Sequence, residues 1–135
     1  MGFLRRVGAR PSLLGVVALF LAAPASAQPE SVTRSVIQEQ PIPAPQYRAV
    51  TVKTVIAAGG ETPPHTHPGV EMAYIVAGDA VLRIKGKSDW KLSGGDSFSV
   101  PRDTVHSVRN TGAGALTIVS TYIVDKDQPI VIPAR

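Results

Sequence analysis

The chain has 135 residues, the size of a single domain, and 44% of them are hydrophobic. It contains no cysteine, which excludes a disulfide scaffold, a thiolate metal site and a cysteine nucleophile. The formal net charge is +4 at pH 7, but the first 27 residues hold three arginines and no acidic residue, so residues 28–135 carry 11 basic and 10 acidic side chains. This near-balance gives no electrostatic reason to expect a nucleic-acid partner or an anionic membrane.

The N-terminal residues have the three parts of a secretory signal peptide. Arg5, Arg6 and Arg10 precede an apolar run from Leu13 to Ala23, and an Ala-Ser-Ala segment follows at 25–27. A membrane anchor is the less favoured alternative, because the run is shorter than the roughly 20 apolar residues that cross a bilayer. We predict cleavage after residue 27 and a periplasmic or secreted protein that is not bound to a membrane once it is cleaved.

Residues 28–46 are predicted to form a proline-rich N-terminal arm. This polar segment carries prolines at positions 29, 41, 43 and 45. Because proline cannot donate a backbone hydrogen bond, we expect at most a short strand in the arm, at Ser31–Ile37.

Residues 47–135 are predicted to form an all-β domain without a substantial helix. Short segments rich in Val, Ile, Thr and Tyr recur at intervals of roughly 8–12 residues between Gly, Pro, Asp and Asn, as in a sandwich or barrel. Leu116–Val124 alternates between two moderately apolar sets, which predicts a strand covered on both faces. The other expected strands are Tyr47–Ala57, Met72–Ala77, Ala80–Lys85, Trp90–Leu92, Ser97–Val100, Val105–Arg109 and Pro129–Ile132.

Three tight connections are expected between these strands, and the third is Asn110–Gly114. Gly78-Asp79 is a two-residue hairpin signal between two apolar segments. Lys85–Asp89 contains glycine and small polar residues, and it predicts a second turn between consecutive strands.

All three histidines of the chain fall in two short segments. His65 and His67 are one residue apart, and on an extended backbone such residues project to the same side. Neighbouring prolines at 63, 64 and 68 hold this segment extended. Glu71 lies four residues beyond His67, and His106 lies in the second segment, so three nitrogens and one oxygen are available to a single ion.

This donor set suits one divalent transition metal, namely Fe, Mn, Ni, Cu or Zn. A His-x-His pair alone is weak evidence, since a histidine in a β protein is usually a surface or satisfied core residue. Here the whole histidine complement and a glutamate take part, which favours a metal site. Four protein ligands leave two positions of an octahedral ion free, and Glu71 would either stay bound or act as the general base.

The first histidine segment resembles a known family motif. Gly59-x5-His65-x-His67-x3-Glu71-x6-Gly78 is similar to the first conserved motif of the cupin superfamily at every defining position.

The second segment resembles the other cupin motif. Gly95-x5-Pro101-x-Asp103-x2-His106-x3-Asn110 matches it with one departure, because Asp103 stands where the pattern usually has glycine. Aspartate tolerates positive φ better than most residues, so the turn is expected to persist. The segment of 16 residues between the motifs, 79–94, is typical of small single-domain bacterial cupins.

The resemblance implies a double-stranded β-helix, or jelly-roll barrel, with the metal inside it. If Glu71 points inward then Ala73 and Ile75 do too, and His106 likewise implies Val108, so we expect a small and mostly apolar cavity for a compact organic ligand. The side chains of Tyr47, Tyr74, Arg83, Phe98 and Tyr122 are expected in the core or on the surface in preference to the site.

Members of this superfamily have several activities, and the shared site does not choose between them. We expect a metal-dependent, dioxygenase-like oxidoreductase acting on a small enol, diketone or phenolic compound. The alternatives are a non-catalytic periplasmic protein that binds a metal or a small ligand, and an oxygen-independent lyase or isomerase. Cupin barrels commonly pair through an N-terminal strand, so the resemblance also implies a homodimer formed through the arm.

Overall fold

The computed structural model describes residues 30–134, and this part of the chain contains ten strands and no helix. The all-β prediction is therefore confirmed. The signal peptide predicted at residues 1–27 lies outside the described residues and stays a prediction. No helix between residues 30 and 134 could cross a membrane. The strands are β1 (Val32–Pro41), β2 (Tyr47–Ile56), β3 (His65–Thr66), β4 (Gly69–Ala77), β5 (Asp79–Ile84), β6 (Trp90–Ser93), β7 (Ser97–Val100), β8 (His106–Asn110), β9 (Leu116–Asp125) and β10 (Ile132–Pro133).

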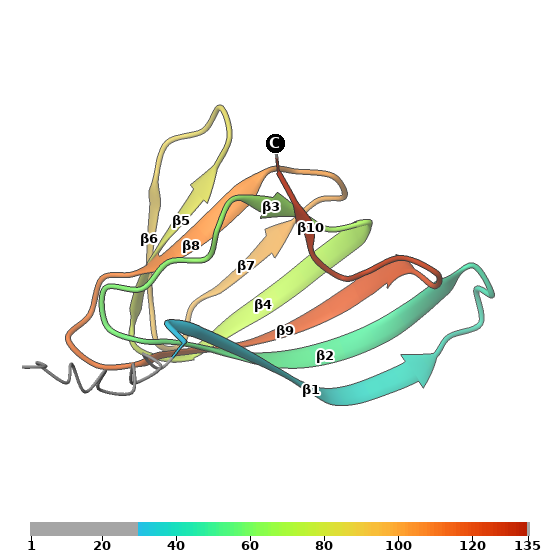
Figure 1. Ribbon diagram of the computed structural model, residues 1–135, viewed down its shortest axis with the longest axis horizontal. Coiled ribbons are helices and arrows are strands. Elements are labelled where there is room, and N and C mark those ends of the chain that lie inside the picture. Colours follow the sequence, from blue (N-terminus) through green and yellow to red (C-terminus); the bar gives the residue numbers. More distant parts are fainter. Residues whose placement is uncertain (1–29, 135) are drawn as a thin grey trace, which may run out of the picture.

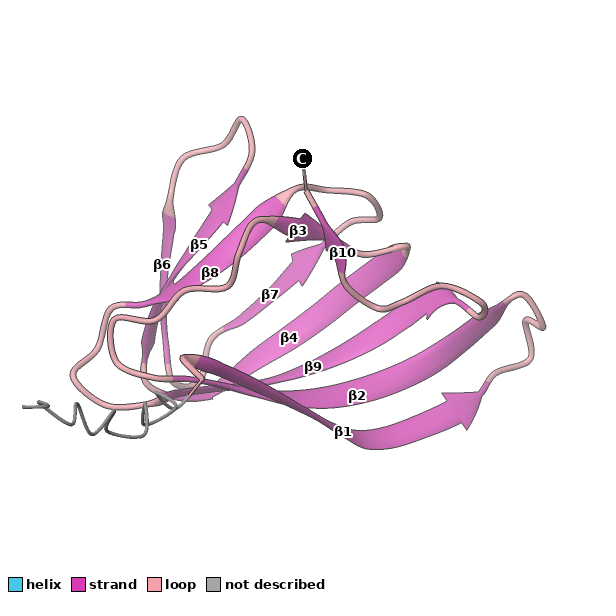
Figure 2. Cartoon of the chain, viewed as in Figure 1, coloured by secondary structure: helices cyan, strands magenta, loops and turns pink. Residues whose placement is uncertain are grey.

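The strands form two five-stranded antiparallel sheets that face each other, as in a double-stranded β-helix (Figure 1). One sheet has the order β1-β2-β9-β4-β7, and the other has the order β10-β3-β8-β5-β6. Figure 2 shows that the long strands β2, β9 and β4 build most of the first sheet and that the second sheet covers one face of it. The two histidine segments meet in the second sheet, because β3 pairs with β8 there.

The hydrophobic core fills the space between the two sheets. On β9 the predicted alternation is confirmed, since the set that begins with Leu116 is buried and the other set is half-buried. The larger core cluster packs Ile75 of β4 and Leu82 of β5 against Phe98 of β7 and Ile118 of β9. A smaller cluster contains Val50, Val52, Tyr122 and Val124.

The N-terminal arm is more regular than the sequence predicted. β1 spans ten residues and pairs with β2 along its length, from Val32 opposite Ile56 to Pro41 opposite Arg48. The prediction of at most a short strand was wrong because no proline occurs between residues 30 and 40, and Pro41 only ends the strand. An edge strand also tolerates proline, since one side of it makes no ladder hydrogen bonds.

The predicted hairpin at Gly78-Asp79 is not formed. β4 and β5 lie in different sheets, and Gly78, with φ of 97°, turns the chain from one sheet into the other. This positive φ is one that glycine adopts without strain. The second predicted connection is confirmed, because β5 and β6 pair as a hairpin across Lys85–Asp89. The strand at His65–Thr66 was not predicted, since two residues carry no periodicity.

Candidate metal centre

Two of the predicted ligands are direct neighbours across a pair of strands. His65 on β3 lies opposite His106 on β8 in the antiparallel register, and the centroids of the two rings are 4.3 Å apart. Side chains that face each other on neighbouring strands lie on the same face of the sheet. Both imidazoles therefore point from the second sheet into the interior, although the two residues are far apart in the sequence.

The other two ligands reach the same point from the chain that crosses between the sheets. His67 follows β3, and Glu71 lies on β4 of the first sheet, where it pairs with Tyr122 of β9. Gly69 begins β4 between them, and a Cβ at this position would collide with the backbone of Ile123 on β9. The absence of a side chain at Gly69 thus lets β4 pack against β9 with Glu71 directed inward.

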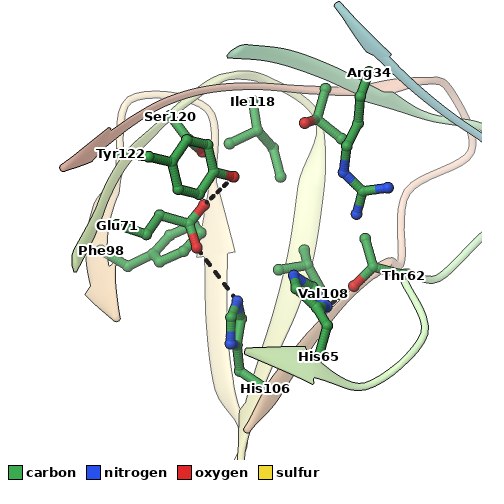
Figure 3. Close-up of a pocket in the computed structure, with 11 residues that line it drawn as sticks. Arg34, Thr62, His65, Glu71, Phe98, His106, Val108, Ile118, Ser120 and Tyr122 are labelled. Atoms are coloured by element: carbon green, nitrogen blue, oxygen red, sulfur yellow. Dashed lines mark hydrogen bonds and ion pairs between the residues drawn. The ribbon is translucent and has the colours of Figure 1, made fainter. Parts of the chain in front are cut away.

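All four predicted side chains are buried and lie around one point. One ring nitrogen from each of His65, His67 and His106 lies within 4.8 Å of the others. The Oε2 atom of Glu71 lies 3.2 Å from Nε2 of His67 and 3.3 Å from Nε2 of His106. Figure 3 shows His65 and His106 on one side of this cavity and Glu71 on the other. Metal–nitrogen distances of about 2.0–2.1 Å place two nitrogens on one ion at most about 4.2 Å apart, so the three imidazoles would close in slightly to share an ion.

Backbone carbonyl oxygens fix the orientation of each imidazole. The Nδ1 atom of His65 lies 2.7 Å from the Pro63 oxygen, that of His67 2.6 Å from the Ile130 oxygen, and that of His106 2.9 Å from the Thr104 oxygen. A carbonyl oxygen only accepts hydrogen bonds, so each Nδ1 carries the hydrogen and donates it. In a neutral ring this leaves the lone pair on Nε2, the arrangement that metal-binding histidines commonly have.

The Nε2 atoms and the carboxylate together require a positive charge among them. The Nε2 atom of His67 is buried and makes no hydrogen bond within the described residues, although Oε2 of Glu71 is close to it. Two acceptor atoms in contact in a buried site repel each other unless a proton or a metal ion lies between them. The donor set and its geometry therefore fit a divalent metal ion held by three imidazoles and one carboxylate.

The pKa values of His65 and Glu71 favour the protonation states that these two residues need as metal ligands. Burial lowers the pKa of His65 to about 4, and the hydrogen bond to Pro63 opposes this only in part. Burial alone would raise the pKa of Glu71, but its contacts with His106 and His67 outweigh burial and hold that pKa well below its usual range. At neutral pH, His65 is thus a neutral base and Glu71 is an anion, as metal ligands must be.

Tyr122 is a site residue that the sequence reasoning assigned to the core or the surface. Its hydroxyl donates a hydrogen bond of 3.0 Å to Oε1 of Glu71, which leaves Oε2 directed at the histidines (Figure 3). Burial, followed by the charge of Glu71, raises the pKa of Tyr122 well above its ordinary value, so the hydroxyl keeps its proton. The alternation on β9 placed Tyr122 in the inward-facing set, but its hydrogen-bond partner, Glu71, lies 51 residues away in the sequence and could not be identified from this pattern.

The cavity lined by His65, Glu71 and His106 is small and more polar than predicted. Its volume is about 20 Å³. Val108 lines it as expected, but Ala73 and Ile75 belong to the hydrophobic core and do not line it. The polar lining was not predicted, because most of its polar side chains other than the predicted ligands come from strands that carry no predicted ligand. The lining residues are Arg34, Thr54, Thr62, His65, Glu71, Phe98, His106, Val108, Ile118, Ser120 and Tyr122.

The turn before β8 connects the two motifs. Asp103 has φ of 57°, so the expectation that aspartate adopts this conformation in place of glycine is confirmed. Its backbone N–H donates to the carbonyl oxygen of His67 at 3.0 Å. Arg102 makes two hydrogen bonds to the carboxylate of Asp125 and one to the carbonyl oxygen of Pro68. These contacts hold the His67 segment against the turn that leads to His106.

The Cupin domain family matches residues 52–122, which is slightly more than half of the chain and includes all four predicted ligands. Among curated relatives, germin-like protein 11-1 of Oryza sativa is 40% identical over 73 residues, which are 50% of this chain and 33% of that protein. The HTH-type transcriptional regulator PuuR of Escherichia coli is 36% identical over 56 residues, which are 42% of this chain and 30% of PuuR. The chain thus spans about a third of the length of these relatives.

Solved structures share the fold at lower sequence identity. An uncharacterised double-stranded β-helix protein from Klebsiella pneumoniae superposes with a TM-score of 0.62 at 20% identity, covering 80% of this chain and 90% of that one. Recombinant oxalate oxidase in complex with glycolate also gives a TM-score of 0.62, at 19% identity, covering 78% of this chain and 56% of the oxidase. At such identities the likeness concerns the fold alone, and it agrees with the family match: the chain belongs to the cupin-domain family.

Proposed function

We propose that this protein is a metal-dependent, dioxygenase-like oxidoreductase that acts on a small organic enol, diketone or phenolic compound. The observation that carries the proposal is the convergence of three Nε2 atoms and one carboxylate oxygen beside a cavity that is large enough for only a few ligand atoms. Small-molecule sites are typically concave, with a few convergent polar groups in an apolar lining. Phe98, Val108 and Ile118 provide the apolar part of the lining here.

Each of the four ligands has a definite role in this proposal. His65, His67 and His106 hold the metal through Nε2, because their Nδ1 atoms are committed to backbone carbonyls. When bound, a divalent metal polarises a ligand oxygen, lowers the barrier to proton loss and, as Fe(II), supports reaction with dioxygen. Glu71 either remains a ligand or accepts the substrate proton on Oε2, and Tyr122 orients it through Oε1 in both cases.

The comparisons support an enzyme without specifying its reaction. One of the solved structures with this fold is an oxalate oxidase, and this is the support for choosing an oxidoreductase. A shared fold does not determine a reaction, so the choice needs a direct test.

Oxygen consumption tests this proposal. Fe(II)-loaded protein is incubated with a panel of 1,3-diketones, enols and phenolics, and dioxygen uptake is followed with an electrode. We expect uptake with at least one compound and none with a His106→Ala variant. Absence of uptake across the panel, in protein shown to hold one iron per chain, would contradict the oxidoreductase assignment.

A non-catalytic role in binding a metal or a small ligand is the second candidate. Its support is the match to PuuR, a transcriptional regulator, in which the similar segment forms less than a third of the protein. Tight binding of a compound from the same panel without any change in that compound would favour this role. Conversion of the compound in the absence of oxygen would favour the third candidate, a lyase or isomerase.

The homodimer and export from the cytoplasm also remain proposals. β1 is the outermost strand of its sheet and pairs on one side only, which supports dimer formation through the arm. Export to the periplasm or the medium is supported by the composition of residues 1–27 alone.

A further inference from the structure

We propose that Arg34 on β1 binds a carboxylate group of the substrate, so that the substrate is a small organic acid held between this guanidinium and the metal. This inference rests on the proposed metal site and narrows the class of compound that the site accepts. Arg34 lies in the segment predicted as the N-terminal arm, and it was not among the predicted site residues.

The register of β1 turns Arg34 toward the cavity. It pairs with Thr54 of β2, which is buried and also lines the cavity, whereas the next pair, Ser35 and Lys53, belongs to the opposite face of the sheet. Figure 3 shows the guanidinium directed into the cavity on the side of Thr62, across from Glu71. The N-terminal strand therefore contributes a side chain to the same cavity as the histidines of the second sheet.

Arg34 differs from the other arginines that the structure describes. Four arginines between residues 30 and 134 form ion pairs with Asp or Glu: Arg48, Arg83, Arg102 and Arg109. Arg34 forms no ion pair and no side-chain hydrogen bond within the same range. A guanidinium offers a planar set of donors that matches both oxygens of a carboxylate, and at Arg34 these donors remain available to a ligand.

The charges around the cavity favour an anion between Arg34 and the metal position. Arg34 and His65 line the same cavity, and the guanidinium is positively charged at neutral pH. A divalent ion beside the histidines would place a second positive charge opposite this guanidinium. A carboxylate between them interacts favourably with both charges and relieves their mutual repulsion.

The size and lining of the cavity indicate an organic acid with few atoms. The inner volume of about 20 Å³ accommodates only a small group, so the rest of a ligand extends toward the mouth, where Arg34 is exposed. The apolar side chains of Phe98, Val108 and Ile118 line the same space and favour a carbon skeleton over inorganic phosphate. A carboxylic acid with a hydroxyl or enol oxygen on a neighbouring carbon would place its carboxylate at Arg34 and its other oxygen at the metal position.

Calorimetric titration tests the inference in two stages. Mn(II) is first titrated into the wild type and into the Arg34→Gln, Arg34→Lys and Lys53→Gln variants. Lactate, its uncharged analogue lactamide, and inorganic phosphate are then titrated into each Mn(II)-loaded protein. Lys53→Gln is the matched control, because it removes one positive charge from the opposite face of the same sheet.

We expect Arg34→Gln to bind Mn(II) at least as tightly as the wild type but to bind lactate at least about tenfold more weakly. Its affinity for lactamide should stay within about twofold of that of the wild type. Arg34→Lys should give an intermediate lactate affinity, since it keeps the charge and loses the planar donor set. Lys53→Gln should behave as the wild type does in every titration.

Four results would overturn the inference. Equal lactate affinity in the wild type and Arg34→Gln, or no lactate binding to loaded wild type, would remove the role of Arg34 while leaving the metal site intact. Phosphate binding more tightly than lactate and depending on Arg34 would show that the anion is not a carboxylate. Failure of the wild type to bind Mn(II) would instead overturn the proposed metal site, and this inference with it.

Discussion

Gly69 lies between His67 and Glu71, at the point where the chain passes from one sheet to the other. Its backbone packs so closely on Ile123 that a methyl group has no room there. The φ of Gly69 is not positive, so space and not backbone conformation requires glycine at this position. The separation of β4 from β9, and with it the position of Glu71, depends on this single missing side chain.

A Gly69→Ala substitution is therefore expected to damage both the fold and the site. Overpacking of a buried position typically costs roughly 1–3 kcal/mol, and a backbone neighbour cannot move as a side chain does. We expect a lower unfolding temperature and weaker metal binding, measured by thermal melting and by calorimetric titration. Gly114→Ala is the control, because a Cβ at Gly114 meets nothing within 4 Å. Equal effects of the two substitutions would contradict this account of Gly69.

The positions of the four proposed ligands could be predicted from local spacing, because each depends on a short segment. His65 and His67 are one residue apart on an extended backbone and so share one side, and the turn at Asp103 could be expected from the tolerance of aspartate for positive φ. Tyr122 and Arg34 could not be predicted in this way. Their roles depend on strand register with residues that are distant in the sequence, and a pattern within one segment contains no information about register.

At the scale of elements, β1 serves the site and also exposes an apolar surface. Arg34 reaches the cavity from this strand, while Val36 and Ile37 are 58% and 56% exposed. A register shift between Val36 and Gln38 interrupts the pairing with β2 at this point. Exposed apolar side chains on an edge strand favour contact with another chain, which supports the expected homodimer.

A Val36→Lys substitution should weaken this dimer, because a charged group would replace an apolar group in the contact. Size-exclusion chromatography with light scattering is expected to show a dimeric wild type and a larger monomer fraction for the variant. Val76→Lys is the matched control, since Val76 is 50% exposed on β4 and not on β1. A wild type that is monomeric at all concentrations would refute the dimer, and equal dissociation of both variants would refute the role of β1.

At the scale of the whole molecule, the proposed ligand set forms because the chain alternates between the two sheets. His65 and His106 come from one sheet and Glu71 from the other, so one ion would connect both sheets. Alternation on β9 was predictable from the sequence, but the change of sheet at Gly78 was not. A glycine between two apolar segments has the same sequence signal in a hairpin as in a crossing between sheets, and only the packing of both sheets distinguishes the two.

Equilibrium titration with Zn(II), followed by calorimetry, tests the central claim most directly. The wild type should bind one ion per chain, and each of His106→Ala and Glu71→Ala should bind it at least about 100-fold more weakly, because each variant lacks a direct ligand. A metal that binds only the folded state also stabilises it, so loading should raise the unfolding temperature of the wild type. Absence of binding by the wild type, or undiminished binding by His106→Ala, would contradict a single ion held between the two sheets.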